Sequence, residues 1–204
     1  MKIWLITDTH IGHKNMITSC GRPENFSRLI LNNWEKKVAN TDKVIHLGDI
    51  AWGDDNLNKL TRMPGHKILI RGNHDPKSLA NYMEAGFDFA CDELGMIIEG
   101  VRILFTHRPR IGHKAEVNIH GHEHDVHRVS ETELLLPIAL EVMGYEPIEL
   151  DHEFIRKVRS WSDKFKAYGT LPTLDEIRLL GPNPIPALRE RDYIGMHGMK
   201  KNED

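Results

Sequence analysis

Three short apolar runs alternate with amphipathic helical patterns in the first half of the chain. The runs have the length and β-branched content of buried strands, and they cover Lys2–Thr7, Lys43–Leu47 and Lys67–Ile70. Apolar residues recur at helical spacing over Glu24–Ala39, from Asp54 or Asp55 to Met63, and from Pro76 to Ala85. This strand–helix alternation predicts an α/β fold with a parallel sheet.

The second half of the chain has a different pattern. Gly95–Glu99 and Val101–Phe105 flank Gly100 and predict a hairpin or tightly joined strands. Further strands are expected at Val117–His120, His127–Val129 and Ile138–Val142. Because no helical pattern separates these short runs, we expect a second sheet packed on the first.

The C-terminal part, residues 151–204, is expected to add a helix and a Pro/Gly-rich tail to a main domain of residues 1–150. An apolar stripe predicts a helix over Asp151–Tyr168, and Thr173 can cap a short helix after it. The polar last ten or so residues are expected to fray. Such a tail can pack on the main domain, cover part of its site or mediate dimerisation, and the sequence leaves these alternatives and the oligomeric state open.

Composition indicates an ordinary globular protein. Of 204 residues, 40% are hydrophobic and 28% are charged, and the net charge is −3. The chain lacks the excess of positive charge that is typical of dedicated nucleic-acid-binding proteins, although nucleic acid remains a possible substrate. The apolar start is too short for a signal peptide, no apolar run is long enough for a membrane span, and the two cysteines form no motif. We therefore expect a cytoplasmic protein.

Side chains with metal-ligating atoms follow the predicted strands. Asp8 and His10 are two residues apart on extended backbone, so their side chains point to the same side. The other candidates likewise stand at the ends of apolar runs: Asp49, Asn73 with His74, His107, and His122 with His124. Each of these pieces is a weak signal alone, and the series in this order is a strong one. His46 lies inside its strand and is interpreted as a hydrogen-bonded core residue.

This series of D-x-H, G-D, G-N-H-D, H and G-H-x-H blocks closely resembles the calcineurin-like metallophosphoesterase superfamily, in particular its small, single-domain bacterial and phage-type members. The resemblance spans residues 1 to 150. It implies a four-layer α/β/β/α sandwich of two mixed sheets with a two-metal site at the loop ends. It also implies that Asp8, His10 and His124 hold one ion, that Asn73, His107 and His122 hold the other, and that Asp49 bridges them.

The resemblance implies a metal-dependent phosphoesterase in which a hydroxide bridging two cations, roughly 3.5–4 Å apart, attacks phosphorus. His74 would be the catalytic histidine that assists the leaving group, with Asp75 orienting it. His13 and Arg108 stand beside ligand positions and are candidate phosphate contacts, although each can equally be an exposed side chain. Nitrogen and oxygen ligands without thiolates suit Mn, which we expect, or Fe, Zn, Ni or Co.

Small phosphodiesters are the favoured substrates, on analogy with small uncapped members of the family. Phosphomonoesters and nucleic acids are the alternative substrates for the same site. A non-catalytic metal-bound scaffold is a further alternative, and the complete ligand set disfavours it. The residues Arg108-Pro109-Arg110 replace the small residues that follow the corresponding histidine in many relatives, which leaves substrate choice open.

Overall fold

The strands of the protein form two sheets. A computed structural model of the chain describes residues 1–127 and 130–181. The first sheet has the order β4-β3-β2-β1-β9, with β1 at Ile3–Ile6, β2 at Lys43–His46, β3 at His66–Ile70, β4 at Phe89–Cys91 and β9 at Ile148–Glu149. The second has the order β5-β6-β7-β8, with β5 at Glu93–Ile98, β6 at Val101–Thr106, β7 at Val117–His120 and β8 at Leu135–Pro137.

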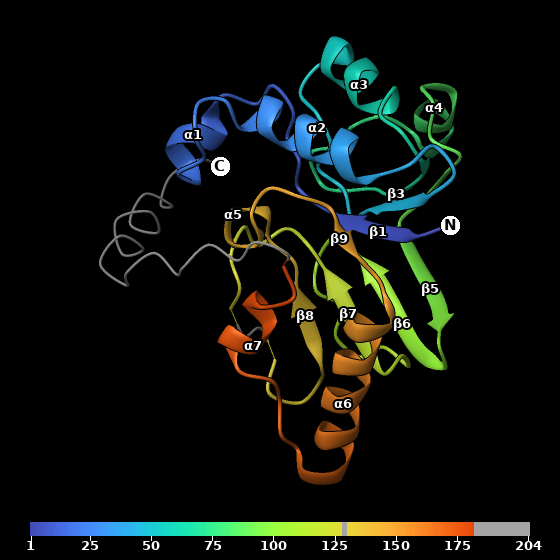
Figure 1. Cartoon of the computed structure of the whole chain (residues 1–204), viewed down its shortest axis with the longest axis vertical. Coiled ribbons are helices and arrows are strands. Elements are labelled where there is room, and N and C mark those ends of the chain that lie inside the picture. The colour runs from blue at the N-terminus through green and yellow to red at the C-terminus, as the bar shows by residue number, and fades with distance from the viewer. Residues whose placement is uncertain (128–129, 182–204) are drawn as a thin grey trace.

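The first sheet is parallel from β4 to β1, and β9 pairs with β1 in the antiparallel sense. Helices connect most of the parallel strands because a parallel partner can be reached only by a crossover. The helices before the second sheet are α1 at Asn15–Ser19, α2 at Phe26–Lys37, α3 at Asp54–Thr61 and α4 at Leu79–Glu84. Figure 1 shows α2, α3 and α4 together on one side of the first sheet.

One apolar core lies between these helices and the first sheet. Trp34 of α2 is fully buried there with Ile30 and Leu60, and its indole N–H donates to the carbonyl of Pro64 at 2.9 Å. Burying the Ile30 or Leu60 side chain contributes about 1.5–3 kcal/mol. The residue alternation of β1 places Trp4 and Ile6 in this core, while Leu5 points to the other side of the sheet.

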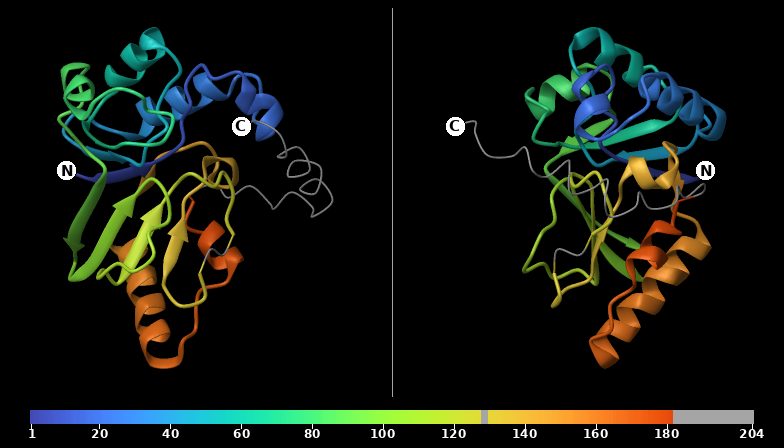
Figure 2. Two further views of the ribbon diagram at one scale, coloured as in Figure 1. Left: turned by 180° about the vertical axis from the view of Figure 1, so that it is seen from behind. Right: turned by 90° about the vertical axis from the view of Figure 1, so that its left-hand side faces the viewer.

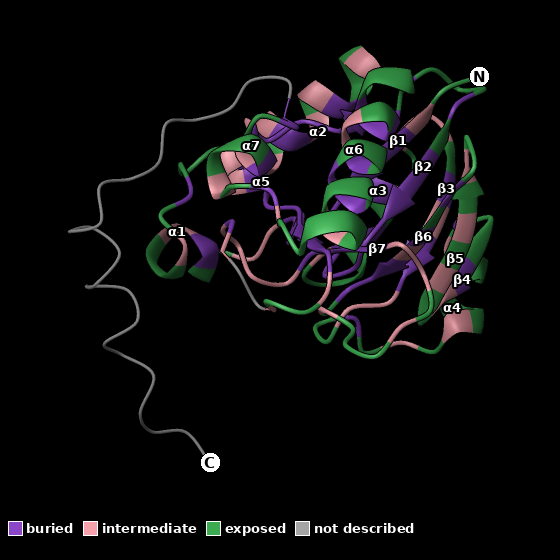
Figure 3. Ribbon diagram, turned by 90° about the horizontal axis from the view of Figure 1, so that it is seen from below, coloured by how far each residue is buried: buried purple, intermediate pink, exposed green. Residues whose placement is uncertain are grey.

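A second apolar core joins the two sheets to the C-terminal helix. It contains Leu5 and Ile45 from the first sheet with Ile103 and Phe105 from the second. The remaining helices are α5 at Leu140–Met143, α6 at His152–Tyr168 and α7 at Leu174–Arg178. Helix α6 runs beside the second sheet (Figure 2), and its buried stripe enters the same core (Figure 3).

The predicted α/β class with two mixed sheets is confirmed. The hairpin around Gly100 is present as β5 and β6, and Thr173 caps α7 with a complete capping box. None of the helices in the two described ranges is long and apolar enough to cross a membrane.

Some local predictions were wrong. The run Ile138–Val142 is not a strand, because Ala139 is followed directly by α5. Helix α4 starts at Leu79 rather than Pro76, since Ser78 provides the N-cap by accepting from the Asn81 amide. Strands β4, β8 and β9 and the short helices α1 and α5 were not foreseen, because segments of two to five residues carry no clear period. The strand expected at His127–Val129 and the frayed last residues fall wholly or partly outside the described ranges.

Candidate functional site

The candidate ligands share an unusual backbone conformation. Five of them have positive φ angles between 44° and 74°, in the left-handed region, and these are Asp8, His10, Asp49, His122 and His124. This conformation costs roughly 1–3 kcal/mol for a residue with a side chain, and such strain concentrates at functional sites. The loops therefore hold these side chains in positions that unconstrained backbone would avoid.

Asp8, His10 and His124 form the first group. Their ligating atoms lie within 4.8 Å of one another. Asp8 Oδ1 and His10 Nε2 are buried and make no hydrogen bond. Burial raises the pKa of the Asp8 carboxyl, and burial lowers the pKa of the His10 ring. Buried, unpartnered lone pairs are costly unless they meet a cation, so the donor set of this group fits a metal ion.

Asp49, His107 and His122 form the second group, and their ligating atoms are also within 4.8 Å of one another. His107 Nδ1 lies 2.7 Å from the Leu47 carbonyl, so Nδ1 must carry a proton and donate it. In a neutral ring, Nε2 then presents a lone pair to the Asn73 Oδ1 atom at 2.9 Å. Two lone pairs at this distance repel each other unless a proton or a cation lies between them.

Asp49 lies between the two groups. Its Oδ2 atom is 3.4 Å from His10 Nε2 and 3.5 Å from His107 Nε2. Its Oδ1 atom accepts a hydrogen bond from the backbone N–H of His74 at 2.8 Å. The arrangement gives one carboxylate access to both groups, which is the position that a shared ligand of two cations needs.

Two glycines allow the ligand loops to approach each other. A Cβ atom on Gly72 would lie 2.1 Å from Asp49 Oδ1, and one on Gly121 would lie 2.4 Å from Asp8 Oδ2. Neither distance is tolerable for non-bonded heavy atoms. The glycine of the G-N-H-D motif is thus a steric requirement of the Asp49 carboxylate. The glycine of the G-H-x-H motif is required both by the Asp8 carboxylate and by Thr7 Oγ1, which would lie 2.0 Å from the Cβ.

Asp75 holds loops together. Its carboxylate accepts hydrogen bonds from the backbone N–H groups of Gly72, Asp49 and Ile50 at 2.7, 2.8 and 3.0 Å. Among the hydrogen bonds of the described residues, none joins this carboxylate to the His74 ring. The contact expected from the sequence is therefore replaced by one that ties the β2 loop to the β3 loop.

Arg22 and Glu141 are site residues that the sequence analysis missed. Glu141 Oε1 lies 2.7 Å from His124 Nδ1 and 2.6 Å from Arg22 Nη2. The buried Arg22 guanidinium also donates to the backbone carbonyls of Asp8 and Thr9. No motif flagged these residues, because Arg22 and Glu141 are separated by 119 positions and meet only in the folded chain.

These contacts set the electrostatics of His124. Burial by itself lowers its pKa, but hydrogen bonds with Cys20 and Glu141 and the charges of Glu141 and Asp8 outweigh burial and raise the pKa to about 11. The His124 Nδ1–H donates a hydrogen bond to Glu141 Oε1, and Nε2 of the same ring lies 3.8 Å from Asp8 Oδ1. A carboxylate behind a histidine in this way typically orients a metal ligand.

His74, His13 and Arg108 surround the two groups. His74 is exposed, and its ring centroid is 5.5 Å from that of His10. The His13 ring lies 5.5 Å from His10 and stacks on Trp52. Arg108 is exposed and reaches Asn73 Oδ1 at 3.4 Å. The sequence-predicted residues therefore gather in one place, with His74 and Arg108 open to solvent.

His46 is a core residue, as the sequence analysis favoured. The backbone N–H of Gly48 donates to Nδ1 at 3.1 Å, so the ring proton is on Nε2, which contacts Thr9 Oγ1 at 2.9 Å. Burial is the main cause that lowers the His46 pKa to about 3. A neutral imidazole thus connects the β1 and β2 loops beneath the site.

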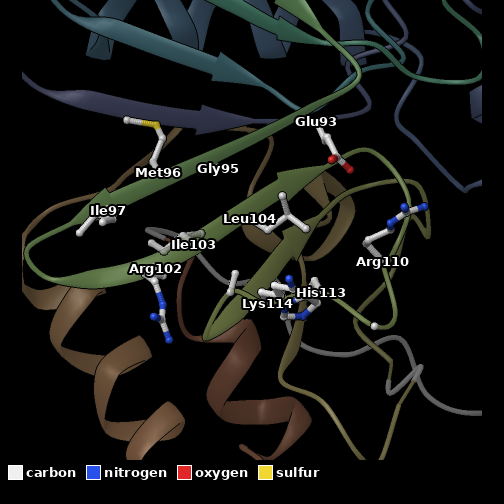
Figure 4. Close-up of a pocket in the computed structure, with 12 residues that line it drawn as sticks. Glu93, Gly95, Met96, Ile97, Arg102, Ile103, Leu104, Arg110, His113 and Lys114 are labelled. Carbon is white, nitrogen blue, oxygen red and sulfur yellow. The ribbon is translucent and has the colours of Figure 1, made fainter.

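A separate hollow of about 500 Å³ lies on the second sheet, on the face opposite the core residues Ile103 and Phe105. Its lining includes Arg102, Leu104, Arg110 and Lys114, which Figure 4 shows around β5, β6 and the loop that follows β6. None of the candidate ligands lines it. The hollow is therefore separate from the two groups of candidate ligands.

Comparison with known proteins agrees with this geometry. Residues 1–137 match the model of the calcineurin-like phosphoesterase superfamily domain. The uncharacterized protein MJ1445 of Methanocaldococcus jannaschii is 30% identical over 167 residues, which cover 74% of this chain and 88% of that protein. The gene 66 protein of Mycobacterium phage D29 is 28% identical over 156 residues, which cover 60% of this chain and 78% of that protein.

A solved structure also resembles this one. It is a protein of unknown function, AQ665 from Aquifex aeolicus, with a TM-score of 0.64 and 26% identity, covering 77% of this chain and 98% of that chain. Members of the matched superfamily typically bind divalent metals, and the two groups of His and Asp side chains provide candidate sites for them. With a family model matched over more than half of its length, the chain belongs to the calcineurin-like phosphoesterase superfamily.

Proposed function

We propose that this protein is a metal-dependent phosphodiesterase with a two-cation site. The observation that carries the proposal is the position of Asp49, whose Oδ2 atom lies 3.4 Å from His10 Nε2 and 3.5 Å from His107 Nε2. One carboxylate oxygen within reach of both histidine-containing groups has the position that a shared ligand of two cations needs. Superfamily membership supports phosphoric ester hydrolysis as the reaction class.

The proposed first cation site consists of Asp8, His10, His124 and Asp49. The second consists of Asp49, Asn73, His107 and His122. Divalent cations held there would neutralise phosphate charge and lower the pKa of water. The mixed nitrogen and oxygen donors suit Mn, which we propose, and equally allow Fe, Zn, Ni or Co.

His74 is the proposed proton donor to the leaving group. Its backbone is fixed by the hydrogen bond to Asp49 Oδ1, while its side chain is exposed beside His10. An imidazole held at one end and open at the other can reach an ester oxygen without rearrangement of the loop. His13 and Arg108 are proposed phosphate contacts, since both flank the two groups and carry N–H donors.

Diester preference is supported by the openness of this site. A phosphodiester carries two organic groups, so at least one must extend away from the cations into solvent. The exposure of Asn73, His74 and Arg108 leaves space for such a group. A closed rim would favour the smaller monoester.

The test is hydrolysis of bis-p-nitrophenyl phosphate and p-nitrophenyl phosphate after chelation and after addition of Mn, Fe, Zn, Ni or Co. We expect turnover of the diester that depends on added cation and exceeds that of the monoester. Asp49→Asn should abolish it, while Asp55→Asn, at an exposed position of α3, serves as the matched control. If neither ester is hydrolysed with any of these cations, the proposed enzymatic activity is refuted. Faster hydrolysis of the monoester than of the diester would refute the diester preference.

A further inference from the structure

The loops after β1 and β2 pair with each other beside the candidate site, and residues 11–13 and 50–52 form what we call the rim. The Ile11 N–H donates to the Ile50 carbonyl at 3.0 Å, and the Trp52 N–H donates back to the Ile11 carbonyl at 2.9 Å. The Asn56 side chain donates to the Trp52 carbonyl at 2.7 Å. This pairing fixes the positions of the side chains that the rim carries.

Trp52 and His13 stack on this rim. Their ring centroids are 4.4 Å apart and the rings are inclined by only 8°. His13 in turn lies 5.5 Å from the His10 ring, so two ring-to-ring steps lead from a candidate ligand to the indole. His13 covers one face of Trp52, and yet Trp52 remains 55% exposed. The exposed surface must therefore belong to the other face and the edge of the indole.

This exposure is unusual within the chain. The chain has four tryptophans, and Trp4, Trp34 and Trp161 are buried, with 5%, 0% and 6% exposure. A large apolar ring left in water loses the free energy that burial would supply. An indole held flat by a neighbouring ring loses little further conformational freedom when a second flat group stacks on it.

We propose that the exposed face of Trp52 is a stacking platform for the base of a nucleoside-type phosphate ester. The inference rests on the proposed function, because the ester of such a ligand would lie at the cation site while its base reaches the rim. Aromatic side chains bind bases mainly through their π-faces, with little dependence on base identity. The platform thus assigns a substrate class of small nucleotide esters and leaves the choice among bases broad.

A small nucleotide fits better than a long nucleic acid. Polynucleotide binding depends on rows of Lys and Arg that contact successive phosphates, and this chain has a net charge of −3. Around the site, Arg108 lies by Asn73, and Lys77 pairs with Asp54, so these two cations do not form a row. A ligand with one phosphate and one base therefore fits this surface better than a polynucleotide does.

The first experiment measures binding without turnover. Because Trp52 is the exposed tryptophan, its fluorescence can be separated from that of the buried ones by its sensitivity to acrylamide. We expect AMP to quench it in the Zn-loaded protein and to bind roughly tenfold or more tighter than ribose 5-phosphate, which has the same phosphate without the base. Calorimetric titration does not depend on the indole, and it should show that Trp52→Ala removes this difference and that Trp52→Phe restores part of it.

Tyr168→Ala is the matched control, because Tyr168 is an aromatic residue with 81% exposure at the end of α6, outside the candidate site. It should keep the wild-type preference for AMP. Equal affinity of wild type for AMP and ribose 5-phosphate, or an undiminished preference in Trp52→Ala, would overturn the platform. Binding of oligonucleotides without binding of AMP would also overturn it, in favour of a nucleic-acid surface.

The second experiment compares two esters with the same leaving group, the p-nitrophenyl esters of thymidine 5′-phosphate and of ethyl phosphate. The nucleoside ester should have the lower KM, and the ratio of the two KM values should fall toward one in Trp52→Ala. Hydrolysis of both esters with a ratio unaffected by Trp52→Ala would overturn the platform and leave the proposed phosphodiesterase intact. A Trp52-dependent preference for AMP without hydrolysis of any ester would do the reverse.

Discussion

The strongest test of the site architecture is the substitution Glu141→Gln. Glu141 receives hydrogen bonds from His124 Nδ1 and from the Arg22 guanidinium. Glutamine keeps the size of the side chain and one acceptor oxygen, but it removes the negative charge. The Arg22 side chain is fully buried, so its charge would lose its anionic partner. The variant separates the charge of Glu141 from its volume.

The magnitude follows from this burial. Removing one partner of a buried ion pair costs about 3–5 kcal/mol of unfolding free energy. Arg22 keeps its hydrogen bonds to the carbonyls of Asp8 and Thr9, and glutamine can still accept one bond, so we expect about 3 kcal/mol. Loss of a carboxylate behind a ligating histidine typically lowers metal affinity about 10- to 100-fold, and we expect that range for the first cation site.

Urea unfolding measures the stability change. Calorimetric titration with Mn, after a chelator has removed bound metal, measures the affinity of each cation site. The matched control is Glu153→Gln, which alters an exposed ion pair with Lys157 on α6 and should cost less than about 1 kcal/mol. The reasoning is refuted if Glu141→Gln binds two cations with wild-type affinities, or if its stability loss equals that of the control.

Further predictions concern the catalytic histidine, the glycine contacts and acid stability. His74→Ala should bind Mn like the wild type but lose about 100-fold or more in kcat, and an unchanged kcat would remove His74 from catalysis. Gly121→Ala places a Cβ 2.4 Å from Asp8 Oδ2 and should weaken cation binding in titrations, while Gly95→Ala, with no atom within 4 Å, should not. The folded pKa of His46 is depressed to about 3 from an ordinary value of 6.5, so the unfolded state binds the extra proton between these values. Stability present above pH 6.5 is therefore lost as pH falls toward 3, and His46→Gln should show a shallower decline, by about 1.4 kcal/mol per pH unit, in urea unfolding of the chelated protein. Parallel declines would refute the assignment of that proton to His46.

Local pattern was sufficient for the elements that carry the candidate ligands. The apolar runs before Asp8, Asp49 and Asn73 are long enough to identify strands, and the helical stripe after Asp151 identifies α6. The pattern failed where a segment was short or decided by a cap. The run Ile138–Val142 has strand-like composition, but the chain instead turns into α5, which positions Glu141 behind His124.

The sequence by itself determined the α/β class, the order of the ligand blocks and the family resemblance, because these depend on period and spacing along the chain. Only the tertiary structure decided that Asp75 binds three amides, that Arg22 and Glu141 support His124, and that Trp52 stacks on His13. The physical reason is that hydrogen bonds and ring contacts depend on direction and distance within a few tenths of an ångström. Such geometry arises only when loops far apart in the chain are brought together, and the residue types alone do not specify it.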